Sequence, residues 1–166
     1  MLMASYEKVI NKLYDKYDIP QMIPAPLMLI AKALGYGVYD FHLTADNKKT
    51  SGVVYYKQDD QTEGEILLNP NEPNSRKRFT LAHEIGHIVL KHQGDGEKRT
   101  VDKREDMEKM SKSPKEYAAD AFAAELLMPA EEFTKYWIQC ANIFQLAEMF
   151  FVSKQAALIR IENLGI

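Results

Sequence analysis

The chain has 166 residues, of which 46% are hydrophobic and 27% charged, so it can bury a sizeable core as one globular domain. Its formal net charge of −3 gives no general attraction for nucleic acid phosphates or anionic lipid. The lone Cys140 excludes an internal disulfide, and the sequence has neither a signal-peptide pattern nor a run of about 18 apolar residues that would span a membrane. We therefore expect a cytoplasmic protein with a single domain over residues 1–166.

The first part of the chain mixes helical and extended patterns. Apolar side chains at helical spacing predict a helix over 4–17, and a short helix is expected over 27–34, after a segment with three prolines. Stretches typical of β-structure predict three strands, over 38–43, 52–57 and 65–69. We expect residues 64–69 to form an edge strand, to which an extended peptide can add as a further strand.

The next helix carries the most informative pattern of the chain. Ser75 is a suitable N-cap for a helix that continues to about His92 and contains the HExxH pentad at 83–87. Four residues advance about 400° on a helix, so His83 and His87 lie on one face, one turn apart. Two imidazoles so placed can hold one zinc ion, and Glu84 can then take a proton from a water at the metal. The pentad therefore predicts a hydrolase, with a peptide bond as the first candidate substrate.

A catalytic zinc site normally has three protein ligands and one open position for water, so the pentad leaves one ligand to be found. The extended pattern HExxHxxGxxH is excluded, because the two required positions hold Leu90 and Gln93. His92 comes nine residues after His83, about 900° round the helix, which places it on the opposite face. We expect His92 to be a surface histidine near the helix C-terminus, where positive charge is favourable. His42 falls on a predicted strand and has no partner signal.

The other source of a third ligand is the helix expected over 114–128, which begins after a Ser-Pro pair. Glu116 and Asp120 are four residues apart and share a face, so Glu116 can bind zinc while Asp120 accepts the other ring N–H of a ligand histidine. Asp120 and Glu125 remain alternative ligands, and a solvated acidic stripe is the competing interpretation. Against that interpretation, the alanine-rich segment 118–124 suits a helix that packs closely on the pentad helix.

These two helices together resemble one known family. Residues 78–87 (RFTLAHEIGH) and 119–129 (ADAFAAELLMP) are similar to the ImmA/IrrE family of zinc metallopeptidases, and the likeness covers nearly the whole chain. The resemblance implies that the pentad histidines bind zinc, that Glu84 is the general base and that an acidic residue ahead of the Phe-Ala segment completes the site. Many members carry Glu directly before the Ala-Asn/Asp pair, where this chain has Ala118. Others carry it two residues earlier, which matches Glu116.

The resemblance also implies a biological role. Members encoded on phages and integrative elements cleave, or help to inactivate, a helix-turn-helix repressor encoded nearby, and others regulate stress responses through a similar repressor. Because the chain ends at Ile166, it resembles the short, mobile-element type. We weigh three hypotheses: a zinc endopeptidase acting on such a repressor, a non-proteolytic zinc-containing anti-repressor that sequesters it, and a DNA-binding regulator. The intact Glu84 favours the first, since a structural zinc site needs no base beside an open coordination position.

The remaining segments give weaker signals. Residues 93–113 are mostly charged and are interpreted as a mobile excursion, either a flap over the site or a solvated loop. A last pair of helices is expected over 130–151, with a break near Cys140, and over 153–163. Residues 144–160 resemble a helix-turn-helix, but the tail has few cations, which are Lys135, Lys154 and Arg160. We interpret it as helical packing or a repressor-docking surface, with direct nucleic acid binding unfavourable.

These elements predict an α+β fold. We expect a mostly helical, zincin-like metallopeptidase domain with a small three-stranded sheet and a C-terminal helical pair over residues 130–166.

Overall fold

A computed structural model describes residues 3–42, 44, 48–58, 63–93, 99–103 and 113–166. The elements in chain order are α1 (Met3–Tyr17), α2 (Leu27–Ala33), β1 (Tyr36–Asp40), β2 (Thr50–Tyr55), β3 (Gly64–Leu68), α3 (Asn74–Val89), β4 (Arg99–Lys103), α5 (Pro114–Leu127), α6 (Ala130–Cys140), α7 (Ile143–Phe150) and α8 (Lys154–Leu164). The predicted α+β class, mostly helical with a small sheet, is confirmed. Among the described residues, no helix combines the length and the apolar character needed to cross a bilayer.

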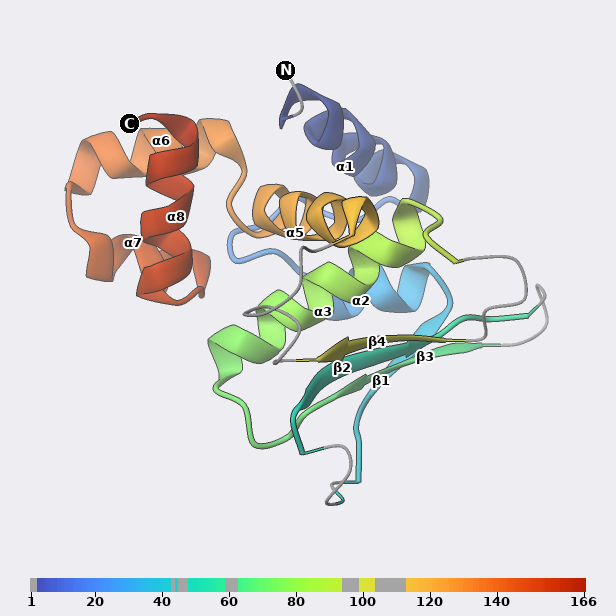
Figure 1. Cartoon of the computed structure of the whole chain (residues 1–166). Helices are drawn as coiled ribbons and strands as arrows, with labels where there is room; N and C mark the ends of the chain where they lie inside the picture. The colour runs from blue at the N-terminus through green and yellow to red at the C-terminus, as the bar shows by residue number, and fades with distance from the viewer. Residues whose placement is uncertain (1–2, 43, 45–47, 59–62, 94–98, 104–112) are drawn as a thin grey trace.

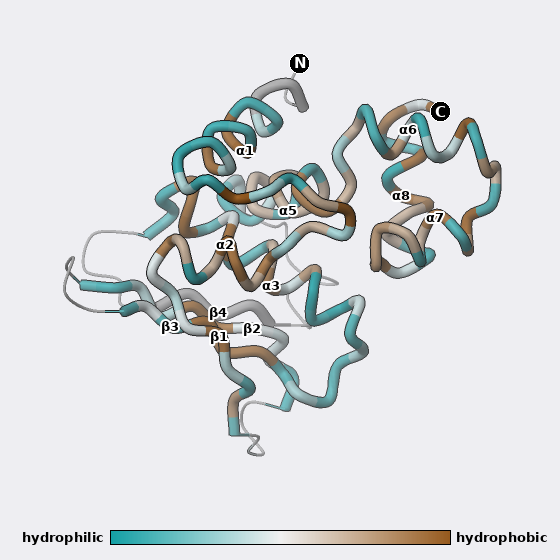
Figure 2. The backbone as a smooth tube through the Cα atoms, turned by 180° about the vertical axis from the view of Figure 1, so that it is seen from behind, coloured by the Kyte–Doolittle hydropathy of each residue, from teal (hydrophilic) through white to brown (hydrophobic). Residues whose placement is uncertain are grey.

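The helices are layered on one face of the sheet (Figure 1). Helix α3 packs against β2 and β3, α2 packs against β1 and α3, and α5 lies between α3 and α1. Hydrophobic residues occur in each of these layers (Figure 2), and the fully buried ones include Ile30, Val54, Ile66, Ile85 and Phe122. Helices α6–α8 gather beside one end of α5 (Figure 1). The pentad helix α3 is therefore covered by the sheet on one side and by α5 on the other.

The strand order in the sheet is β1-β3-β2-β4. Strand β3 pairs in parallel with β1 and antiparallel with β2, so the prediction that residues 64–69 form an edge strand is wrong. Alternation of side chains marks a strand but does not reveal its neighbours, which are decided by the crossover that brings β1 beside β3.

The sheet also contains a fourth strand, β4, which pairs antiparallel with β2. It falls inside the charged segment 93–113, for which the sequence predicts a mobile excursion. No strand is predicted there because the sequence of β4, RTVDK, lacks the apolar pattern of a buried strand. Within the described residues β4 pairs with β2 alone, so β1 and β4 are the edges. The rest of the predicted flap, 94–98 and 104–112, lies outside the described residues.

Gly86 of α3 and Ala119 of α5 allow these two helices to lie close together. A Cβ added at Gly86 would lie 3.1 Å from Phe122 Cδ1, 3.2 Å from the Ala119 carbonyl oxygen and 3.3 Å from Ala119 Cα. The absence of a side chain at Gly86 therefore offsets its cost of roughly 1 kcal/mol in a helix interior, because α5 can approach the pentad.

The C-terminal region contains three helices rather than the predicted pair. Ala141 adopts a left-handed conformation with φ 44°, which ends α6. The Asn142 side chain then caps α7 by accepting hydrogen bonds from the backbone N–H of Phe144 (3.0 Å) and Gln145 (3.2 Å). The chain therefore turns at the place where a break near Cys140 was expected, and it turns sharply enough to make a separate helix.

Candidate metal centre

Helix α3 brings the two pentad histidines to one point. The side chains of His83 and His87 are buried, and their Nε2 atoms lie 3.0 Å apart. Their ring centroids are separated by 4.7 Å. The helical spacing alone accounts for this geometry, because residues four apart stack on one face. Both rings thus direct the same nitrogen towards a shared position.

Glu116 in the first turn of α5 completes this group. Its carboxylate oxygens lie 3.1 Å from His83 Nε2 and 3.3 Å from His87 Nε2. Ser113 positions this turn as N-cap, since its side chain accepts a hydrogen bond from the Glu116 backbone N–H. One potential ligand atom from each of the three residues lies within 4.8 Å of the other two. Two imidazole nitrogens and one carboxylate fit a tetrahedral metal ion such as zinc, with a fourth position left for water or substrate.

Asp120 lies one turn further along α5, on the other side of the His83 ring. The Nδ1–H of His83 donates a hydrogen bond of 2.8 Å to the Asp120 carboxylate. This contact places the proton on Nδ1 and leaves the Nε2 lone pair for a metal ion. The Asp120 carboxylate therefore contacts the edge of the His83 ring that faces away from Glu116 and His87, which does not fit the alternative role of third ligand.

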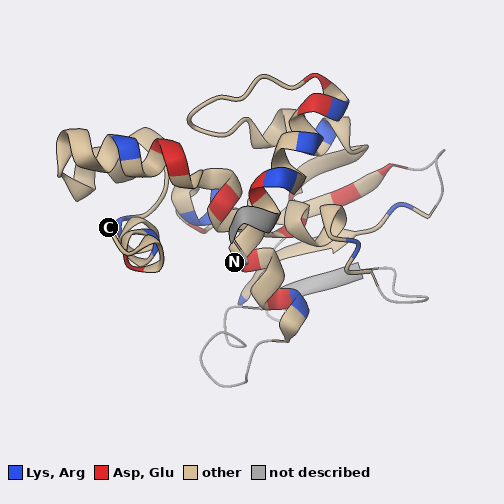
Figure 3. Ribbon diagram, turned by 90° about the horizontal axis from the view of Figure 1, so that it is seen from above, with Lys and Arg blue, Asp and Glu red and all other residues tan. Residues whose placement is uncertain are grey.

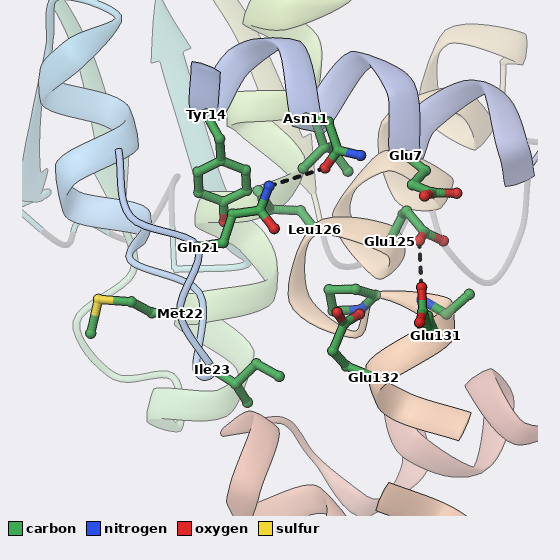
Figure 4. Close-up of a pocket in the computed structure, with 13 residues that line it drawn as sticks. Glu7, Asn11, Tyr14, Gln21, Met22, Ile23, Glu125, Leu126, Glu131 and Glu132 are labelled. Atoms are coloured by element: carbon green, nitrogen blue, oxygen red, sulfur yellow. Dashed lines mark hydrogen bonds between the residues drawn. The ribbon is translucent and has the colours of Figure 1, made fainter. Parts of the chain in front are cut away.

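Glu125, the other alternative ligand, points away from the pentad. It forms a buried ion pair with Arg160 of α8, and it accepts a hydrogen bond of 3.1 Å from the Ala130 backbone N–H. It lines a separate pocket with Glu131 and Glu132 of α6 (Figure 4). Its role in the structure is to hold the C-terminal helices.

The expectation for His92 is wrong. Its Nδ1 lies 3.0 Å from the Nδ1 of His87, so it is a neighbour of the pentad and not a histidine on the opposite face. The reason is that α3 ends at Val89 and Lys91 adopts a left-handed φ of 54°. The His92 backbone N–H then donates back to the His87 carbonyl at 2.9 Å, and the chain reverses. Rotation of 100° per residue does not extend past the end of a helix. His42, after β1, is outside the one metal-ligating group found among the described residues.

Glu84 is almost completely buried, at 1% exposure, and packs against β2. A Cβ at Gly52 of that strand would lie 3.1 Å from Glu84 Oε1 and only 2.4 Å from the Thr80 methyl group. A side chain at position 52 would therefore collide with Thr80 and press on the Glu84 carboxylate. Gly52 was not among the predicted site residues, although a glycine in a strand is a signal of close approach.

Two of the clustered groups have strongly altered acidity. Burial alone would lower the pKa of His83, but hydrogen bonds to Asp120 and Glu116, together with the nearby charge of Glu84, outweigh it and raise that pKa to about 10. Hydrogen bonds from His83 and His87 hold the pKa of Glu116 far below its usual range, against the opposing effect of burial. Both shifts have the same cause, which is that each charged form is stabilised by the oppositely charged partner beside it.

A helix with an HExxH pentad, a carboxylate supplied by a later helix and a buried glutamate beside the first histidine together define a class of metal-dependent hydrolases. Comparison with family models agrees with this class. The chain belongs to the family described as the IrrE N-terminal-like domain, whose model matches residues 33–162 and which is a peptidase family. This confirms the resemblance to ImmA/IrrE proteins. No curated protein matches the chain.

Proposed function

We propose that the chain is a zinc-dependent endopeptidase with His83, His87 and Glu116 as the metal ligands. The observation that carries this proposal is the meeting of two Nε2 atoms and one carboxylate within 4.8 Å, in a chain that belongs to a metallopeptidase family. We propose zinc because catalytic zinc ions in proteins are usually bound by three histidine or carboxylate ligands, with a fourth position open to water.

The protein residues have separate roles in peptide hydrolysis. When bound, zinc supplies Lewis acidity that lowers the pKa of water and polarises a carbonyl oxygen. Asp120 orients the His83 ring through the 2.8 Å hydrogen bond at Nδ1. Glu84 accepts the proton of the attacking water and transfers it to the leaving amine. Glu84 is buried beside Gly52 of β2, and close packing of this kind favours the defined geometry that a proton transfer needs.

The substrate would bind in an extended form along β4, not along β3 as the sequence led us to expect. Strand β3 is internal, whereas β4 pairs with β2 alone among the described residues. Gly52, at which an added Cβ would lie 3.1 Å from Glu84 Oε1, is paired with Asp102 of β4. The edge strand therefore runs about one strand spacing, roughly 4.8 Å, from the strand that covers the base. A peptide added to this edge would pass close to the catalytic residues.

We propose that the substrate is a cytoplasmic helix-turn-helix repressor, as the family resemblance implies. Helices α6–α8 are the candidate docking surface, because large apolar side chains are exposed there, including Ile138 (75% exposed) and Phe144 (63%). These helices carry few cations and at least as many acidic residues (Figure 3), which argues against direct DNA binding. The same apolar exposure favours a second candidate function, a non-proteolytic anti-repressor that binds its partner without cleaving it.

The variant Glu84→Gln separates the two functions. We expect cleavage of a candidate repressor by the zinc-loaded protein to fall by about 10²–10⁴-fold, because an amide cannot accept the proton. Zinc stoichiometry should stay at the wild-type value, since Glu84 is not a ligand. The measurement is the rate of repressor cleavage, followed by gel and mass spectrometry, alongside repressor–operator binding. If Glu84→Gln neutralises the repressor as well as wild type does, binding and not hydrolysis is the mechanism.

Zinc affinity should increase with pH, because zinc needs the neutral His83 nitrogen and the metal-free site holds a proton with a pKa of about 10. We expect up to about tenfold tighter binding per pH unit between about pH 6 and 9. The stability of the metal-free protein should change in the opposite direction. The raised pKa means that protonated His83 stabilises the fold fully below about pH 6.5, and this contribution is lost as pH rises through about 10.

Chelator competition at several pH values, corrected for the chelator's own protonation, measures the first trend, and urea unfolding of the metal-free protein measures the second. A zinc affinity that is flat over this pH range would show that His83 carries no proton in the metal-free site.

A further inference from the structure

Each pentad histidine has a partner at the ring nitrogen that faces away from the metal position. For His83 that partner is the Asp120 carboxylate, at 2.8 Å from Nδ1. For His87 it is another imidazole, since His92 Nδ1 lies 3.0 Å from His87 Nδ1. The two rings meet edge to face, with centroids 5.0 Å apart and planes at 73°. His87 is buried at 2% exposure, and His92 is half-buried.

Two imidazoles that share a hydrogen bond must differ in tautomer at the touching nitrogens, because one donates its N–H and the other accepts with a lone pair. His87 can present an Nε2 lone pair to a metal ion only if its proton is on Nδ1. His87 is therefore the donor, and His92 Nδ1 is the acceptor with its own proton on Nε2. His92 thus keeps the proton of His87 on Nδ1, as Asp120 does for His83.

Two hydrogen bonds hold His92 in this position. Its backbone N–H donates to the His87 carbonyl at 2.9 Å across the left-handed Lys91, so the ring is folded back onto the pentad. Its own carbonyl accepts a hydrogen bond of 2.9 Å from Lys115 Nζ of α5. Lys115 precedes Glu116 directly. The first turn of α5 therefore supplies a ligand and also anchors the turn that carries His92.

We propose that His92 is a positioning residue of the metal centre, which fixes the ring orientation and tautomer of His87 by accepting its Nδ1–H. This inference depends on the proposed function in that a metal ion must bind at His83, His87 and Glu116. Partners of ligand histidines typically contribute 10–100-fold to metal affinity. Substitution of His92 is therefore expected to weaken metal binding strongly, although His92 does not contact the metal ion.

The test compares His92→Asn with His92→Leu, two side chains of similar size. The Asn Oδ1 atom can occupy the place of the imidazole Nδ1 and accept the hydrogen bond, whereas Leu fills the space without an acceptor. His42→Ala, which removes an imidazole outside the group, is the control. Zinc affinity is measured by competition with a chromogenic chelator. We expect about 10–100-fold weaker binding in His92→Leu and near wild-type binding in His92→Asn and His42→Ala.

Two further readouts distinguish orientation from general stability. Thermal unfolding of the metal-free proteins should give similar midpoints for His92→Asn and His92→Leu, while the zinc-induced increase should be smaller for Leu. Long-range ¹H–¹⁵N spectra of the zinc-loaded wild type should show His92 protonated at Nε2 and bare at Nδ1. Equal zinc affinity in Leu, Asn and wild type, or a protonated His92 Nδ1, would overturn the inference. A wild-type protein that fails to bind zinc would instead overturn the proposed function, and with it this inference.

Discussion

Glu116→Gln is expected to abolish tight zinc binding and, with it, peptidase activity. In the wild type, each carboxylate oxygen of Glu116 lies within 3.3 Å of a histidine Nε2 atom. The substitution replaces this carboxylate, the anionic member of the His83, His87 and Glu116 group, by a neutral amide. Zinc affinity should fall by more than the roughly 10–100-fold that loss of a ligand's hydrogen-bond partner costs. The fold should persist, because the Glu116 side chain is 38% exposed and the α5 N-cap at Ser113 uses only the Glu116 backbone.

Metal content after dialysis and chelator competition measure this effect. Glu131→Gln, on the exposed surface of α6, is the matched control and should bind zinc as wild type does. Full zinc occupancy and full activity in Glu116→Gln would mean that another side chain is the third ligand. Loss of zinc together with loss of helical circular dichroism would mean that the carboxylate supports the fold and not the metal.

Arg160→Met should destabilise the protein by about 3–5 kcal/mol, the largest stability effect that we expect from one substitution away from the metal centre. The Arg160 and Glu125 side chains are each 3% exposed. Arg160 also donates to the Met128 carbonyl at 3.0 Å, so it connects α8 to both α5 and the turn before α6. Its removal leaves the Glu125 carboxylate buried without a cation, which costs more than the pair itself contributes.

Urea unfolding followed by two probes tests this expectation. The single tryptophan, Trp137, lies in α6 and reports on the C-terminal helices, whereas circular dichroism reports on all helices. The double variant Arg160→Met with Glu125→Leu should recover part of the loss, because it removes both charges. Lys135→Met, at an exposed position of α6, should change stability by less than about 1 kcal/mol. A cost for Arg160→Met as small as that of this control would contradict a buried and structurally important pair.

The parts of the site that could be predicted from sequence are those that a single helix determines. His83 and His87 meet because they are one turn apart, and Glu116 and Asp120 share a face for the same reason. The structure adds that these two faces lie against one another, which Gly86 allows. Asp120 and Glu125 both had the chemistry of a third ligand, and the packing of α5 against α3 on one side and α8 on the other separates their roles.

Other features depended on where helices end and which strands are neighbours. The helical rotation that set His92 apart from the pentad stops at the left-handed Lys91, and β3 became internal because β1 crosses to lie beside it. Strand β4 has a charged sequence that is compatible with an edge, so pairing with β2 was its only distinguishing feature.

Residue type and helical spacing were enough to predict a pair of metal-binding histidines, a neighbouring base and an acidic helix close by. Helical spacing is a local property that tertiary context rarely changes. The positions of Glu116 at the two pentad Nε2 atoms, of His92 beside His87 and of β4 beside β2 followed from tertiary packing. Those outcomes depend on contacts between segments distant along the chain, and such contacts are governed by packing, which no short stretch of sequence encodes.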